Sequence, residues 1–276
     1  MPENDLLIHK RGPVTRLMIN RPDRLNSLRM GETDRAILGA LKELEADGRT
    51  KVVLLAGAGG KAFCTGWDME EIGETALEDL ENLIRTNLEL FFGVWTSNLP
   101  VVAAVDGYAI GTGSALALAC DLTLASETTK LGEPEVRHGA LSPFLILPFL
   151  THSKAVHEIY YTGDLVGADE LFRLGLVNRV LPTADFEEAS WRYAARLAKV
   201  PAYSLQMTKR SLRAAYEMMG FSSAIRQHGL ADTLVIGADF PEQRALMDIL
   251  IKQGMRAFLD ARDGPFQEDV MEADDA

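Results

Sequence analysis

Short apolar runs of strand length mark the first two thirds of the chain. Residues 52–56 and 101–105 are continuously apolar, residues 14–19 alternate imperfectly, and residues 121–125 form a further strand-like run. Helical spacing of apolar positions separates them, over 32–47, 76–95 and the small-residue segment 113–119. Buried strands without polar alternation, alternating with helices, predict an α/β fold with a mostly parallel sheet covered on both faces.

The last third of the chain has a different pattern. Apolar residues recur there at helical spacing, without strand-like runs, over residues 185–198, 201–219, 221–238 and 241–260. We therefore expect two regions: a sheet-containing core over residues 1–200, and a helical region over residues 201–276 that ends in an acidic tail.

Charge and cysteine content narrow the class of protein. With 28 Lys and Arg against 40 Asp and Glu, the net charge is −12, which disfavours binding to nucleic acid. Cys64 and Cys120 form no CxxC pair, so neither a disulfide framework nor a bound metal is expected. Without an apolar run of membrane-spanning length or a signal-peptide pattern, we expect a soluble, cytoplasmic protein.

Two glycine-rich segments, residues 57–68 and 106–115, each follow a buried strand. Backbone N–H groups left unpaired at such turns can face an anion or a developing oxyanion. Neither segment carries the glycine spacing of a dinucleotide site or the lysine of a P-loop. Taken alone, each is a weak signal, because glycine-rich turns of this kind are often only tight turns.

Motifs in a fixed order resemble the crotonase superfamily, the enoyl-CoA hydratase/isomerase family. The resemblance covers roughly residues 13 to 266, and it is carried by RPDRLNSL (21–28), AGGKAFCTGWD (58–68), VDGYAIGTG (105–113), LALACD (116–121), GEPE (132–135), YTGD (161–164), LGLVNRV (174–180) and GMRAF (254–258). It implies a spiral of ββα turns followed by a C-terminal helical trimerisation region, assembled as a homotrimer or a dimer of trimers.

The resemblance also implies a backbone oxyanion hole for the enolate of an acyl-CoA thioester. By position, its donors are the N–H groups of Trp67 and Thr112, which follow Gly66 and Gly111. Only the peptide groups are used, so the unusual side chains leave the hole intact. The large indole of Trp67 should narrow the space around the thioester.

Acid–base residues distinguish the reactions of the family. The hydratase pattern has two glutamates; here the first position is Ala115, and the second is Glu135. One carboxylate beside an oxyanion hole is the arrangement of members that isomerise 3-enoyl-CoA to 2-enoyl-CoA, with burial raising the pKa of the base. In the alternative interpretation, Glu135 only caps the segment or pairs with Arg137 or His138.

The remaining expected site residues are implied by the same motifs. Possible CoA or substrate contacts are Arg24, Leu25, Gly66, Asp68, Met69, Gly111, Phe258 and Arg262, and His138 is a possible accessory base. Residues 139–148 replace a flexible glycine-rich stretch with Pro and Phe, which indicates a more apolar acyl pocket. The family needs no cofactor besides its CoA thioester substrate.

Three other functions remain open at this point. An enoyl-CoA hydratase with an atypical acid–base set comes second. Decarboxylation or C–C bond cleavage of a CoA thioester needs only the oxyanion hole and a pocket, so Ala115 does not exclude it. A non-catalytic acyl-CoA-binding protein is the alternative of a different class.

Overall fold

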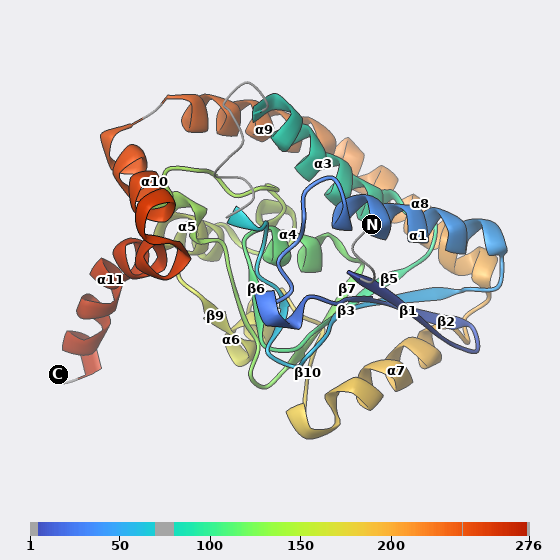
Figure 1. The fold of residues 1–276 in the computed structure, drawn as a ribbon. Helices are drawn as coiled ribbons and strands as arrows, with labels where there is room; N and C mark the ends of the chain where they lie inside the picture. The colour runs from blue at the N-terminus through green and yellow to red at the C-terminus, as the bar shows by residue number, and fades with distance from the viewer. Residues whose placement is uncertain (1–4, 70–79, 239, 275–276) are drawn as a thin grey trace.

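The computed structural model describes residues 5–69, 80–238 and 240–274, and it has the mixed α/β architecture that the apolar pattern predicts (Figure 1). The strands are β1 (Leu6–Arg11), β2 (Val14–Ile19), β3 (Val52–Gly57), β4 (Ala62–Cys64), β5 (Val101–Val105), β6 (Tyr108–Ile110), β7 (Leu122–Ser126), β8 (Lys130–Gly132), β9 (Val166–Gly167) and β10 (Arg179–Leu181). The α-helices are α1 (Thr33–Asp47), α3 (Leu80–Thr96), α4 (Thr112–Ala119), α5 (Ser153–Thr162), α6 (Ala168–Arg173), α7 (Phe186–Leu197), α8 (Ala202–Met218), α9 (Phe221–Gly237), α10 (Pro241–Gln253) and α11 (Met255–Asp274). Short 3₁₀ turns are η1 (Pro22–Arg24), η3 (Pro134–His138), η4 (Leu147–Phe149) and η5 (Thr183–Asp185).

Two sheets organise the described core. The larger has the strand order β1-β2-β3-β5-β7-β10, antiparallel between β1 and β2 and parallel elsewhere. The smaller has the order β4-β6-β8-β9, with only β8 and β9 antiparallel. The prediction of a mostly parallel sheet is confirmed.

Successive residues of the central strands are buried in different layers, which explains their continuous apolar character. Val52 and Leu54 of β3 pack with helix α7, whereas Val53 and Leu55 face the main core. Figure 1 shows α7 on one side of the sheet and helices α1 and α3 on the other. Strands β4, β6 and β8 of the smaller sheet are each followed by one of the turns that carry the predicted site residues.

The helical last third differs from its prediction at one point. A single helix over 241–260 is wrong, because α10 ends at Gln253 and α11 starts at Met255. Gly254 between them has φ 84° and ψ 177°, a backbone conformation outside the helical region that glycine adopts readily. The start of the predicted helix at residues 76–79 lies outside the described residues.

Helices α8 and α9 are not isolated from the sheet-containing part. The buried Lys209 of α8 forms an ion pair with Asp121 at 2.6 Å and donates to the Leu99 carbonyl at 3.0 Å. The division of the chain at residue 200 therefore stays a prediction. Across the described helices, none combines the length and the apolar character needed to cross a membrane.

Candidate active site

In the first glycine-rich turn, the peptide N–H of Trp67 is not used to pair with the neighbouring segment at Leu28. Leu28 N–H donates to the Gly66 carbonyl at 2.8 Å, and Asp68 N–H donates to the Leu28 carbonyl at 2.9 Å. These two bonds form a parallel bridge between Leu28 and Trp67. In such a bridge the N–H of the central residue points away from the partner strand, so the Trp67 N–H is directed elsewhere.

The second glycine turn places a helix N-terminus beside the first. Gly111 has φ 56° and ψ −121°, and helix α4 begins at Thr112, whose N–H has no acceptor inside the helix. A Cβ atom added to Gly66 would lie 3.6 Å from the Thr112 nitrogen. The two turns are therefore adjacent, and the structure brings the predicted donors Trp67 and Thr112 together.

Glu135 lies directly against this second turn. It follows Pro134 on η3, and a Cβ atom on Gly111 would overlap with Glu135 Oε1. Glu135 Oε2 is shut off from solvent and has no hydrogen-bond partner in the described part of the chain. Desolvation, followed by the negative charge of Glu133, raises the pKa of Glu135 well above its ordinary value. A buried carboxyl group with a raised pKa thus adjoins the turn that carries the Thr112 N–H.

The interpretation of Glu135 as an ion-pair partner of Arg137 is wrong. Arg137 pairs instead with Asp164 and, at 3.4 Å, with Asp263, and its Nε donates to the Thr162 carbonyl. Its guanidinium also covers the ring of Phe266. Because Arg137 contacts α11 and the end of α5 instead, it does not pair with Glu135, and Glu135 remains available for proton transfer.

His138 of η3 packs with Phe258 and Arg262 of α11, and the role of these two α11 residues in binding CoA stays a prediction. The His138 ring lies 5.7 Å from that of Phe258, which is only 1% exposed. Arg262 makes a two-pronged contact with Asp263, at 2.9 and 2.8 Å. Burial, and then the charge of Arg262, lower the pKa of His138 to about 4. His138 is therefore neutral at neutral pH, and its role as an accessory base stays a prediction.

The predicted contacts near the first turn fall into two environments. Arg24 and Leu25 are exposed at the end of η1, where Thr65 Oγ1 donates to the Leu25 carbonyl at 3.2 Å. Asp68 is buried, and it accepts from Arg21 Nη2 at 2.9 Å. Its carboxylate thus holds the loop in place, while the half-buried Met69 continues from it.

Sequence reasoning missed a second buried carboxylate, Glu133. It is 2% exposed, and it accepts hydrogen bonds from the hydroxyl groups of Ser114 and Ser142. Burial raises its pKa to about 7. The signal in the sequence was a glutamate two residues before Glu135, in a motif that drew attention to Glu135 alone.

Nucleophilic and metal chemistry find little support in the described part of the chain. Cys64 is fully buried, and desolvation raises the pKa of its thiol to about 12, so it is not a thiolate nucleophile. Within the described ranges, no group of three or more His, Cys, Asp and Glu side chains could hold a metal ion.

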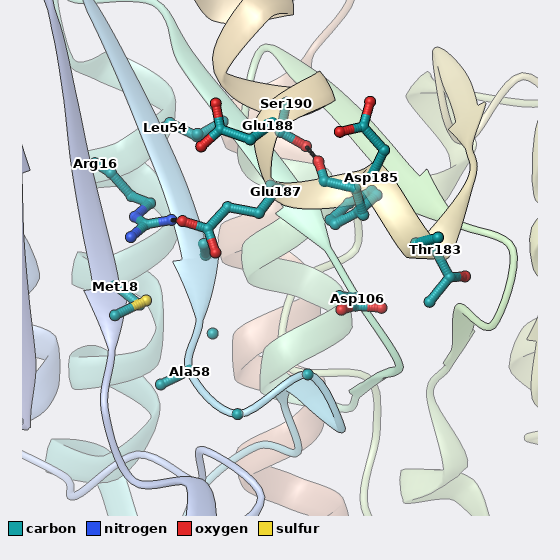
Figure 2. A pocket seen from close by; sticks show the side chains of 17 residues that line it. Arg16, Met18, Leu54, Ala58, Asp106, Thr183, Asp185, Glu187, Glu188 and Ser190 are labelled. Atoms are coloured by element: carbon teal, nitrogen blue, oxygen red, sulfur yellow. Dashed lines mark hydrogen bonds and ion pairs between the residues drawn. The ribbon is translucent and has the colours of Figure 1, made fainter. Parts of the chain in front are cut away.

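A pocket of about 410 Å³ lies elsewhere, between the larger sheet and the start of α7 (Figure 2). Figure 2 shows Arg16 directed at Glu187, with Asp106 and Asp185 nearby. None of the predicted site residues lines this pocket. Its acidic side chains outnumber its single arginine, which disfavours a polyphosphate ligand such as CoA.

Comparisons with known proteins identify the family of the chain and agree with its fold. Residues 9–269 match the enoyl-CoA hydratase/isomerase family model. A protein of Thermus thermophilus that carries the name of an enoyl-CoA hydratase is 36% identical over 92% of this chain and 97% of its own. The crotonyl-CoA hydratase of Syntrophomonas wolfei is 28% identical, covering 96% of this chain and 99% of its own. The crystal structure of an enoyl-CoA hydratase/isomerase from Xanthobacter autotrophicus Py2 superimposes with a TM-score of 0.90 at 31% identity, covering 95% of this chain and 98% of that one.

Proposed function

Because the chain belongs to the enoyl-CoA hydratase/isomerase family, we propose that it transfers a proton on an acyl-CoA thioester, with isomerisation of 3-enoyl-CoA to 2-enoyl-CoA as its preferred reaction. The observation that supports this reaction is the carboxyl group of Glu135 packed on the Gly111 turn, with the buried Ala115 on α4 at the position of the first hydratase glutamate. A shuttle of this kind needs one base and an oxyanion hole, but no activated water.

The proposed reaction proceeds in two proton transfers. Ionised Glu135 removes a proton from C2, and the electron pair moves onto the thioester oxygen to give a dienolate. The Trp67 and Thr112 N–H groups donate hydrogen bonds to that oxygen. Glu135 then returns the proton to C4, and the double bond ends between C2 and C3. Proton and electron counts balance without a cofactor.

Hydration of 2-enoyl-CoA is the second candidate, and one observation favours it. Glu133 is a further buried carboxylate, held by Ser114 beside the position where the family's hydratase pattern has a glutamate. The names of the relatives from Thermus thermophilus and Syntrophomonas wolfei are also those of hydratases. Hydration here would use a different acid–base set from the usual pair.

The experiment that separates these reactions follows proton exchange in D₂O. Deuterium incorporation at C2 and C4 of a 3-enoyl-CoA is measured alongside hydration of a 2-enoyl-CoA. Isomerisation that carries at least part of the C2 hydrogen to C4, and that is reduced about 100-fold or more in Glu135→Gln, supports a one-base shuttle. The exposed Glu158→Gln on α5 is the matched control and should keep full activity. Hydration that outpaces isomerisation would reject the isomerase assignment, and binding without either reaction would redirect the search to decarboxylation or C–C cleavage.

The proposed assembly is a homotrimer or a dimer of trimers, with the helical region of residues 201–276 as its interface. Exposed apolar side chains on α8 and α9 support an interface there: Tyr203, Met207, Leu212, Met218, Leu230 and Leu234.

A further inference from the structure

Glu133 is a buried carboxylate to which the proposed reaction assigns no step. It stands at the start of η3, immediately after β8, and is 2% exposed. Ser114 Oγ donates to its Oε1 at 3.1 Å, and Ser142 Oγ donates to its Oε2. Burying a carboxylate costs free energy that two neutral hydroxyl donors offset only in part. Because burying this carboxylate costs free energy, we expect Glu133 to have a role beyond packing.

Those hydrogen bonds join three parts of the site. Ser114 lies on α4, two residues after the oxyanion donor Thr112. Ser142 lies in the segment that follows η3 and continues toward the apolar residues Phe144 and Ile146. Glu133 itself is separated from Glu135 only by Pro134, whose ring fixes φ. A shift of the Glu133 carboxylate would therefore move the base relative to the oxyanion hole.

We propose that Glu133 is a positioning residue: anchored by Ser114 and Ser142, it fixes the Glu135 carboxyl against the Gly111 turn, and its negative charge strengthens Glu135 as a base. This inference rests on the proposed function of Glu135 in proton transfer. Glu133 does not itself touch the substrate, because both of its oxygens are engaged and it is closed to solvent.

The charges around Glu135 are consistent with this role. Glu133 on its own segment and Asp232 on α9 raise its pKa, whereas Arg262 on α11 lowers it. Tyr160 of α5 also faces both glutamates, and their charges contribute to its raised pKa. Burial raises the pKa of Glu133 to about 7, and the negative charge of ionised Glu133 raises the pKa of Glu135 further. Replacing that charge with an amide must lower the pKa of Glu135.

The test uses the full-length enzyme and the variants Glu133→Gln, Glu135→Gln and Glu158→Gln. Infrared titration of the substrate-free protein in D₂O follows the carbonyl band of protonated buried carboxyl groups, and the band missing from Glu135→Gln identifies Glu135. In Glu133→Gln this band should titrate roughly one pH unit or more lower. Because Glu135 must be ionised to act, the pH profile of C2 exchange should move to lower pH by the same amount. In Glu133→Gln, the kcat on the plateau of the pH profile should fall, while the KM changes less than about threefold.

Three outcomes would overturn the inference. The first is an unmoved Glu135 titration in Glu133→Gln, and the second is a shift of equal size in the Glu158→Gln control. The third is loss of 2-enoyl-CoA hydration in Glu133→Gln with C2 exchange intact, which would make Glu133 a reacting group.

Failure of the proposed function gives a different pattern. The wild type would then turn over no enoyl-CoA, while the infrared titration, which needs no substrate, would still read the coupling of the two glutamates. Should Glu133→Gln not fold, Ser114→Ala keeps the carboxylate and removes one donor. The pKa of Glu133 must then rise, and its own band should titrate at higher pH; an unchanged band would reject the anchoring role of Ser114.

Discussion

Trp67 contributes a backbone donor and a bulky side chain, and the structure separates these two contributions. Its indole Nε1–H donates to Asn87 Oδ1 on α3, so the ring is anchored to a helix. Its peptide N–H points away from the Leu28 strand and is not used in the bridge to it. An oxyanion hole requires only the second of these features.

Two substitutions at this position should therefore differ sharply. Trp67→Ala keeps the N–H, so C2 exchange should fall less than about tenfold, and longer acyl chains should be accepted better. Trp67→Pro removes the donor, and kcat should fall a further 10²–10³-fold or thereabouts. Steady-state kinetics on a series of acyl-chain lengths measures both effects, with circular dichroism to verify folding. Equal losses in the two variants would contradict the assignment of the Trp67 N–H to the hole.

Single residues were predictable from the sequence only where a short motif carries them. Gly66, Trp67, Gly111, Thr112 and Glu135 stand in such motifs, and the structure places them together. The partners of Glu133 are 9 and 19 residues away in the chain, and no local spacing connects three such polar residues.

The turn over residues 21–28 is held to the first glycine-rich loop by one buried amide. Asn26 has φ 57° and is fully buried. Its Oδ1 accepts from the Arg21 N–H at 2.9 Å, and its Nδ2 donates to the carbonyls of Ala58 and Ala62 at 2.9 and 2.7 Å. The adjacent Arg21–Asp68 ion pair ties the same two segments together. These contacts set the position of Gly66 and Trp67.

Asn26→Ala should thus damage both stability and activity. The substitution removes the hydrogen-bond partner of one backbone N–H and two carbonyl groups. We therefore expect the free energy of unfolding to fall by about 2–4 kcal/mol. The C2 exchange rate should fall as well, because the loop that carries Trp67 loses its anchor. Urea denaturation measures the first effect. The control, Asn98→Ala, breaks one exposed side-chain hydrogen bond to Glu45 and should cost less than about 1 kcal/mol. A similar cost for both variants would show that Asn26 does not hold the loop.

Long elements follow from periodicity, whereas short ones do not. The strands over 14–19 and 101–105 and the helix from 202 to 218 match their patterns closely. Strands β4, β6 and β8 have three residues each, too few to establish a period of two. The break at Gly254 was equally hidden, since a lone glycine is compatible with a continuous helical pattern.

At the scale of the whole molecule, helix α9 has two apolar faces but only one is covered within the described chain. Phe221 and Ile225 are fully buried against the core. Leu230 and Leu234, four residues apart and so on one face, are 63% and 75% exposed. Figure 1 shows α8 and α9 along the same side of the molecule as α1 and α3. Burying these leucines between subunits would release water from apolar surface and favour association.

The double substitution Leu230→Glu, Leu234→Glu should consequently dissociate the proposed trimer. Six glutamates would enter a trimeric interface, where desolvation of charge opposes association strongly. Sedimentation velocity should show a trimer or hexamer for the wild type and a monomer for the variant. Ile8→Glu, which places a charge at an exposed apolar site on β1, should leave the assembly unchanged. A monomeric wild type, or an intact trimer in the double variant, would exclude this face of α9 as the interface. Loss of C2 exchange only on dissociation would further indicate that the assembly holds α10 and α11, and with them Arg262, against Glu135.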